Sequence, residues 1–286
     1  MINAQIDFKN ITLGEWLTLW FETYKKPILS QNSLRNIEQQ IRLHTPEWLK
    51  EMPLKEITLF HIDRALLAIP LGRTRKYTKQ VWHNAFKKAQ QLAIIDKNVI
   101  TLTDDVKYKK QKSQALTLKE QTTFIEAIKG RRFEFVMLFY LYTGVRRAEA
   151  LSLEWQDIDE ESGLILIRGT KTEESTRYIL LTDDVKSILE KQRLQNEKEQ
   201  LTGNKVFPYS NQQTSKNFKA VCPNHHLHDL RHTFVTRCAE CGISPNVCQQ
   251  LVGHTTADMT MNVYTHVMDE FKRKEALKFT IFPKMY

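Results

Sequence analysis

Two segments of this chain combine arginine or lysine with glycine, as sites that hold phosphate groups often do. The first, residues 143–149, reads TGVRRAE, and Gly144 interrupts one helical pattern before a new helix begins at Arg146. An arginine at a helix start lies beside backbone N–H groups, which favours a phosphate there. The second, residues 169–172, reads GTKT and places Lys171 in a turn. Taken singly, each is more often an ordinary corner or turn with solvated charges.

Two further segments add groups that can move a proton or form a bond. Residues 228–232 read HDLRH, and His228 and Arg231, three positions apart, share one helical face. A histidine exchanges protons near neutral pH, and an arginine can grip two phosphate oxygens. The fourth segment reads LVGH and ends at His254, ten residues before Tyr264. A lone tyrosine or a lone Gly-His pair would mean little, but together with the other segments they indicate a phosphate-directed site.

A zinc site is the rival interpretation of the third segment. A structural zinc site usually has two clean ligand pairs, and the irregular spacing here, interrupted by Pro223, offers none. We therefore expect no metal, and we expect the two cysteines of the following helix to be small buried hydrophobes. The six residues concerned are Cys222, His225, His226, His228, Cys238 and Cys241.

Composition and charge restrict the class of protein. The 286 residues are 41% apolar and 26% charged, which is typical of a globular protein with room for two domains. No apolar run is long enough to cross a bilayer, the first residues lack a secretion signal, and four cysteines make no disulfide framework. Residues 1–115 hold 19 lysines and arginines against 11 acidic residues, whereas residues 116–286 hold 23 against 22. The sequence thus predicts a cytoplasmic protein whose first part suits a polyanion, although a merely solvated basic surface would look the same.

The spacing of apolar residues predicts a mainly α protein with a small β-sheet (α+β). Residues 1–95 form a helical bundle, residues 96–115 a basic linker, and residues 116–286 a second domain. Thr12 with Glu15, and Thr117 with Glu120, fit capping boxes at helix starts. We expect helices at 11–24, 32–43, 58–69, 78–95, from 117, and across 132–153, strand-like runs at 163–168 and 177–181, and helices again to about 280.

The four segments, in this order and at these separations, resemble the active-site boxes of the tyrosine recombinases, especially integrases of phages and integrative elements from Gram-positive bacteria. The likeness covers residues 116–270, and the first domain resembles the family's SAM-like core-binding domain in architecture. Several spaced boxes that agree on one mechanism are far more specific than any single one. All six positions that the family uses are filled: Arg146, Lys171, His228, Arg231, His254 and Tyr264.

The resemblance implies strand cleavage and rejoining without a cofactor. Tyr264 attacks a DNA phosphate and forms a 3′-phosphotyrosine, while Arg146 and Arg231 clamp the phosphate oxygens. Lys171 protonates the leaving 5′-oxygen and His228 is the base. His254 donates a hydrogen bond to the phosphate, and Glu149 orients Arg146 or the neighbouring helix.

The implied partner is double-stranded DNA at an attachment or core site, bound by four protomers at the bacterial nucleoid, with accessory directionality or DNA-bending proteins possible. The tail 267–282 suits docking on a neighbour or on its own domain. Only about ten residues precede the first predicted helix, so we expect that arm-site binding is absent or that the chain is shortened. We expect phosphate contacts from a basic set around the helix at 78–95 and in the linker: Arg73, Arg75, Lys76, Lys79, Lys87, Lys88, Lys109 and Lys110.

Two alternatives remain on sequence grounds. A type IB topoisomerase cuts DNA with a similar set of residues but relaxes a single duplex. A non-catalytic DNA-binding regulator could use the same scaffold, although complete boxes argue against it. The DNA sequence that is recognised cannot be inferred, because base readout depends on side-chain placement.

Overall fold

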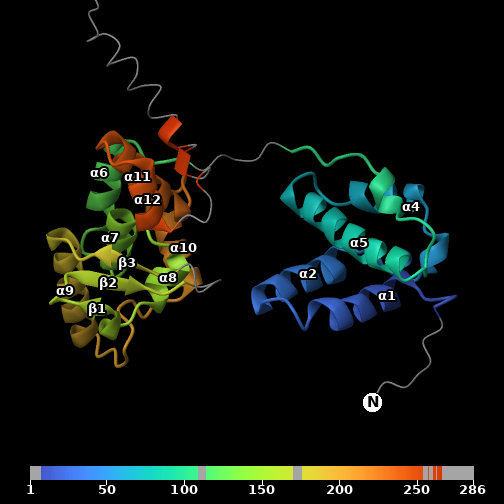
Figure 1. Cartoon of the computed structure of the whole chain (residues 1–286), viewed down its shortest axis with the longest axis horizontal. Coiled ribbons are helices and arrows are strands. Elements are labelled where there is room, and N and C mark those ends of the chain that lie inside the picture. The colour runs from blue at the N-terminus through green and yellow to red at the C-terminus, as the bar shows by residue number, and fades with distance from the viewer. Residues whose placement is uncertain are drawn as a thin grey trace, which may run out of the picture. The chain divides into compact units, whose positions relative to one another are not determined.

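The computed structural model describes residues 8–108, 114–169, 176–253, 257, 260–261 and 263–265. The chain divides into two compact units, Met1–Gln111 and Lys112–Tyr286, and each is a helix-rich body (Figure 1). Within the described ranges, none of the helices combines the length and the apolar character that a bilayer span requires. The expected fold class, mainly helical with one small sheet, is confirmed.

The first unit is a helical bundle around buried aromatic rings. The indole N–H of Trp16 donates to the carbonyl of Ala85 at 3.0 Å, and that of Trp82 donates to the hydroxyl of Thr45 at 3.0 Å, so both buried donors are satisfied. The helix predicted at 78–95 instead runs from Arg73. The helices are α1 (Leu13–Trp20, extended by a π-helical turn Phe21–Lys25), α2 (Gln31–His44), α3 (Glu47–Lys50), α4 (Leu59–Leu67) and α5 (Arg73–Gln91), with 3₁₀ turns at Leu54–Glu56 and Val99–Leu102.

This unit extends past residue 95, where the linker was expected to begin. Val99 and Ile100 lie in the 3₁₀ turn Val99–Leu102 and are buried in the core of the bundle. Asn98 caps that turn by accepting from the N–H of Ile100, and its amide donates to the carbonyl of His83 on α5. The sequence pattern lapses here because a single buried turn carries no helical repeat. The core of the first unit therefore extends beyond residue 95, and the chain divides into its two units between Gln111 and Lys112.

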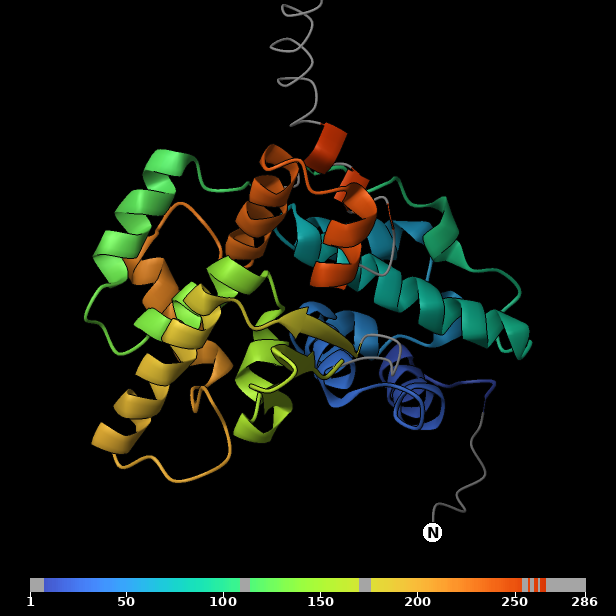
Figure 2. The ribbon, with the colours of Figure 1, turned by 60° about the vertical axis from the view of Figure 1, so that its left-hand side comes forward.

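The second unit packs helices against one face of a small sheet. The helical signals across 132–153 belong to two helices that are separated at Gly144, as predicted. The elements are α6 (Leu118–Ile128), α7 (Glu134–Thr143), α8 (Arg147–Ser152), a 3₁₀ turn (Trp155–Asp157), β1 (Ile158–Asp159), β2 (Leu164–Ile167), β3 (Arg177–Leu180), α9 (Asp183–Lys198), α10 (Asn211–Val221), α11 (His228–Glu240) and α12 (Pro245–Val252). Figures 1 and 2 show α11 and α12 side by side.

The sheet is antiparallel in the order β1-β2-β3, with Ile165 opposite Ile179 and Ile167 opposite Arg177. Side chains of alternate residues point to opposite faces of a strand, so the three isoleucines and Arg177 share the face that is buried against the core. The strands β2 and β3 confirm the two predicted runs, whereas the two-residue β1 carries too few residues to show a pattern.

Candidate active site

The end of α7 is built around Gly144. Its φ of 63° lies in the left-handed region, and a Cβ atom there would be 2.4 Å from a ring atom of Phe234, so only glycine fits. The carbonyl of Gly144 accepts a hydrogen bond from Nη1 of Arg231 at 2.6 Å. The sharp corner after α7 therefore brings the TGVRRAE segment onto α11 and orients the guanidinium of Arg231, whose residue is only 3% exposed.

Arg146 is held by two partners from different parts of the unit. Its Nη1 donates to Oε1 of Glu149 at 2.7 Å, and its Nη2 donates to the carbonyl of Gly253 at 2.5 Å. The backbone N–H of Arg146 also donates to Oε2 of Glu149, at 2.8 Å. The carboxylate of Glu149 thus caps the start of α8 and occupies the backbone N–H of Arg146, which is not free for a phosphate. The expectation that Glu149 orients Arg146 stays a prediction, with which these contacts are consistent.

Sequence reasoning missed one member of this cluster, Arg177 on β3. Its side chain is 11% exposed; Nη2 donates to Oε2 of Glu149 at 3.0 Å, and Nε donates to the carbonyl of Leu251 at 2.8 Å. Arg177 thereby joins the sheet to the first segment and to the turn that precedes His254. The signal was available: Arg177 alternates with Tyr178 and shares the face of the buried Ile179, which is unusual for a charged residue.

The cluster carries a net positive charge in a buried setting. Arg146, Arg177 and Arg231 contribute three positive charges, and Glu149, buried beside them, contributes one negative charge. Burial works to raise the pKa of Glu149, but hydrogen bonds and charge from Arg177 and Arg146 outweigh it and hold that pKa below its usual value. Burial and the neighbouring charge of Arg146 lower the pKa of Arg231, whose guanidinium still stays protonated at neutral pH. An anion entering this site is stabilised by the uncompensated charge.

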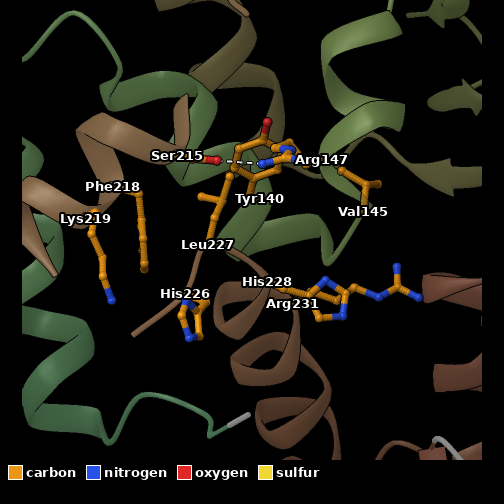
Figure 3. A pocket seen from close by; sticks show the side chains of 10 residues that line it. All are labelled: Tyr140, Val145, Arg147, Ser215, Phe218, Lys219, His226, Leu227, His228 and Arg231. Carbon is orange, nitrogen blue, oxygen red and sulfur yellow. Dashed lines mark hydrogen bonds between the residues drawn. The ribbon is translucent and has the colours of Figure 1, made fainter. Parts of the chain in front are cut away.

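His228 is the first residue of α11 and lies on the same cavity wall as Arg231 (Figure 3). Part of its surface is exposed, but desolvation by the surrounding protein, followed by the positive charges of His232 and Arg231, lowers its pKa to about 4. The ring centroids of His228 and His232 are 5.0 Å apart, and the two ring planes are perpendicular. His228 is therefore neutral at pH 7 and able to accept a proton, and the negative charge of a bound phosphate would raise its pKa.

Tyr264 packs in the small core formed by α11 and α12, together with Val235, Cys248 and Val252. Its residue is 2% exposed, and its hydroxyl donates to the carbonyl of Ile243 at 2.8 Å. Burial first, and then the interaction of the phenol O–H with the sulfur of Cys248 as acceptor, raise the pKa of Tyr264. A hydrogen bond with Cys238 first, and also the charge of Arg231, lower the pKa of the Cys248 thiol, so Cys248 is near both Tyr264 and Arg231.

Several predicted site residues lie outside the described part of the chain. They are Lys171, His254, Lys109, Lys110 and the tail 267–282. Their expected roles remain predictions.

The basic residues of α5 divide into two groups. Nζ of Lys79 donates to the carbonyls of Thr103 and Asp104, and Nε of Arg75 donates to the carbonyl of Ile69. Both side chains thus hold their own unit together, which sequence reasoning did not foresee. Lys88 lies over the ring of Tyr24. The exposed members, which remain suited to phosphate contacts, are Arg73, Lys76 and Lys87.

The residues of the zinc alternative do not converge. His225 lies 3.5 Å from Glu120 and 3.4 Å from Asp229, and Cys238 is buried beside Cys248. Cys241 is exposed at the end of α11, so the expectation that it is buried is wrong. No group of three potential ligands able to hold a metal ion occurs among the described residues.

Comparison with known proteins identifies the family. A model of the phage integrase family matches residues 108–270, and a model of the phage integrase N-terminal SAM-like domain matches residues 12–66. The chain belongs to the phage integrase family. It is 23% identical to a XerC-like tyrosine recombinase of Caldanaerobacter subterraneus, over 93% of this chain and 82% of that protein. It is 30% identical to the tyrosine recombinase XerA of Saccharolobus solfataricus, over 60% of this chain and 58% of that one.

Solved structures share the fold. A lambda integrase dimer bound to a COC′ core site superposes with a TM-score of 0.73 and 24% identity, covering 87% of this chain and 97% of that one. The Tn1549 transposon integrase, solved with circular intermediate DNA, gives a TM-score of 0.73 and 21% identity, covering 92% of this chain and 99% of that one. A lambda integrase tetramer bound to a Holliday junction gives a TM-score of 0.74 and 22% identity, covering 88% of this chain and 80% of that one.

Proposed function

We propose that this protein is a tyrosine-type site-specific recombinase that cleaves and rejoins DNA strands to move a mobile element. The observation that carries this is the buried cluster in which Arg146 and Arg231 keep positive charge that Glu149 only partly compensates. Such preorganised donors stabilise the charge that grows on phosphate oxygens during phosphoryl transfer. The family membership and the recombinases among the relatives support the same reaction.

The reaction proceeds in two balanced steps. The oxygen of Tyr264 bonds to the scissile phosphorus while the bond to the 5′-oxygen breaks, which leaves a 3′-phosphotyrosine and a 5′-hydroxyl. His228 takes the phenolic proton, Lys171 gives a proton to the leaving oxygen, and His254 donates a hydrogen bond to the phosphate. A 5′-hydroxyl of the partner strand then attacks the phosphotyrosine and gives its proton to Lys171, while His228 returns a proton to Tyr264 as its bond to phosphorus breaks. The phosphotyrosine conserves the energy of the broken bond, so no external energy source is needed.

Tyr264 must leave Ile243 to take part, and this departure is the main structural requirement of the proposal. Exchange of two duplexes requires four active sites, so the working form is a tetramer on DNA. The exposed basic residues Arg73, Lys76 and Lys87 would hold the phosphate backbone without reading its sequence.

A nicked suicide substrate tests the function. When the short 5′-hydroxyl fragment diffuses away after cleavage, the covalent protein–DNA adduct accumulates and is resolved on a denaturing gel. The wild type should form this adduct, and Tyr264→Phe should bind the same DNA without forming it. An adduct formed by Tyr264→Phe would remove that residue as nucleophile, and no adduct with any family-type core site would favour a non-catalytic regulator. Recombinant products from two such sites, as opposed to relaxed circles, distinguish the recombinase from a relaxing enzyme.

A further inference from the structure

A cavity of about 480 Å³ lies beside the arginine cluster, between α7, α8, α10 and α11 (Figure 3). Arg231 and His228 form part of its wall, so it is continuous with the proposed phosphate site. Its volume lies within the range of small-ligand pockets and is much larger than a single phosphate group requires. The remaining wall residues have no role in the reaction described above.

Two of these residues, Arg147 on α8 and Lys219 on α10, make the cavity a site for an anion. Figure 3 shows them on different sides of the cavity, and none of the residues that line it is acidic. Nη1 of Arg147 donates to the hydroxyl of Ser215 at 2.5 Å, and Nζ of Lys219 donates to the carbonyl of His225 at 3.1 Å. Within the described residues, neither cation forms an ion pair with a carboxylate. Each therefore keeps its full charge and further N–H donors for a ligand.

Apart from Ser215, His226 and the site residues His228 and Arg231, the rest of the wall is largely apolar. Val145, Phe218 and Leu227 line the cavity together with Tyr140, whose residue is 2% exposed. Apolar carbon surface next to cations suits a ligand that is part sugar and part phosphate, as a nucleotide is. A free inorganic anion would leave most of this surface without a partner.

A DNA strand whose scissile phosphate is held by Arg146 and Arg231 must place a neighbouring nucleotide next to that phosphate, where this cavity lies. We propose that the cavity binds the nucleotide that flanks the scissile phosphate, with its sugar against Val145 and Leu227 and its outer phosphate on Arg147 and Lys219. This inference rests on the proposed function. Its consequence is that Arg147 and Lys219 position the strand for cleavage at one phosphate and not at the next.

The test pairs a change in the protein with a change in the DNA. Nicked suicide substrates carry one neutral methylphosphonate linkage at either phosphate next to the scissile one. Cleavage rates are measured at saturating protein for the wild type, Arg147→Ala, Lys219→Ala and Lys216→Ala; Lys216 is an exposed residue of α10 that does not line the cavity. Loss of a charge-assisted hydrogen bond should slow each pocket variant by roughly 10- to 100-fold. The neutral linkage should slow the wild type by a similar factor at one of the two positions.

The decisive result is non-additivity at that position. Once Arg147 or Lys219 is removed, the neutral linkage should have little further effect, whereas with Lys216→Ala the two effects should multiply. Two results would overturn the proposal. In the first, the effects of the substitution and of the neutral linkage on the cleavage rate multiply for both pocket variants at both positions. In the second, neither linkage changes the cleavage rate of the wild type. Thermal unfolding of each variant shows whether it is folded. The milder substitutions Lys219→Gln and Arg147→Gln replace the alanine variants if those do not fold. Failure of the wild type to form any adduct with unmodified DNA would instead count against the proposed function.

Discussion

The hydroxyl of Tyr264 donates a hydrogen bond to the carbonyl of Ile243 at 2.8 Å, so the proposed nucleophile is stored in contact with a backbone carbonyl. Burial and the thiol of Cys248 raise the pKa of this phenol. Two features thus disfavour attack by the stored form, the hydrogen bond to Ile243 and the raised pKa, and on the proposed function Tyr264 must leave this contact before cleavage.

A difference titration tests the stored state. The ultraviolet absorbance of the wild type minus that of Tyr264→Phe should show no phenol ionising near pH 10, the ordinary tyrosine value, because the folded protein holds the proton of Tyr264 to higher pH. Circular dichroism at each pH limits the comparison to the folded range. A transition of one tyrosine near pH 10 in the difference curve would contradict the stored geometry.

Removing the charge of Glu149 should destabilise the second unit as well as slow cleavage. The carboxylate is fully buried and pairs with both Arg146 and Arg177, so Glu149→Gln leaves two partly buried guanidinium groups without their counter-charge. Breaking a buried pair typically costs about 3–5 kcal/mol. We expect a loss of about this size in denaturant unfolding of the second unit, and slower adduct formation.

The matched control is Glu160→Gln. Glu160 pairs with Lys186 at 3.3 Å on the surface, where both side chains are about half exposed. Exposed pairs contribute roughly 0–1 kcal/mol, so this variant should unfold close to the wild type. Equal stabilities of Glu149→Gln and Glu160→Gln would show that the buried cluster does not support the fold.

The part of the site that follows from local sequence was predictable, and the part that depends on distant partners was not. Gly144 and the start of α8 could be inferred because a helix break and a capping residue leave a signal within a few positions. Arg177 gave no sign of its partners, because Glu149 and Leu251 are 28 and 74 positions away. The stored position of Tyr264 depends on how α11, α12 and the following residues pack, which no local pattern encodes.

The same limit applies to the basic surface of the first unit. Lys79 and Lys87 look alike in the sequence, yet Lys79 binds carbonyl groups 24 and 25 positions away and Lys87 is exposed. We therefore predict that Lys87→Ala weakens DNA binding on all sequences and reduces the slope of log affinity against log salt by about 1. Lys79→Ala should lower the stability of the first unit by about 1–2 kcal/mol and leave that slope nearly unchanged. Salt titrations of DNA binding by both variants test this prediction. A reduced slope of log affinity against log salt for Lys79→Ala alone would mean that Lys79, and not Lys87, contacts the phosphate backbone.

The low pKa of His228 predicts how stability depends on pH. Desolvation and the charges of His232 and Arg231 lower that pKa from the ordinary 6.5 to about 4 in the folded protein. As pH falls, the unfolded chain therefore takes up a proton on this histidine before the folded protein does. The contribution of His228 to the free energy of unfolding should have its full value above about pH 6.5 and decline between pH 6.5 and 4. His228→Gln removes this titration, and its stability should decline less over that range. Adding His232→Gln should flatten the curve further, because burial lowers the pKa of His232 as well. Denaturant unfolding at pH 7.5, 6.0 and 5.0 measures the difference. Parallel curves of unfolding free energy against pH for the wild type and His228→Gln would contradict this prediction. They would mean that His228 protonates normally in the folded protein and is not kept neutral to act as a base.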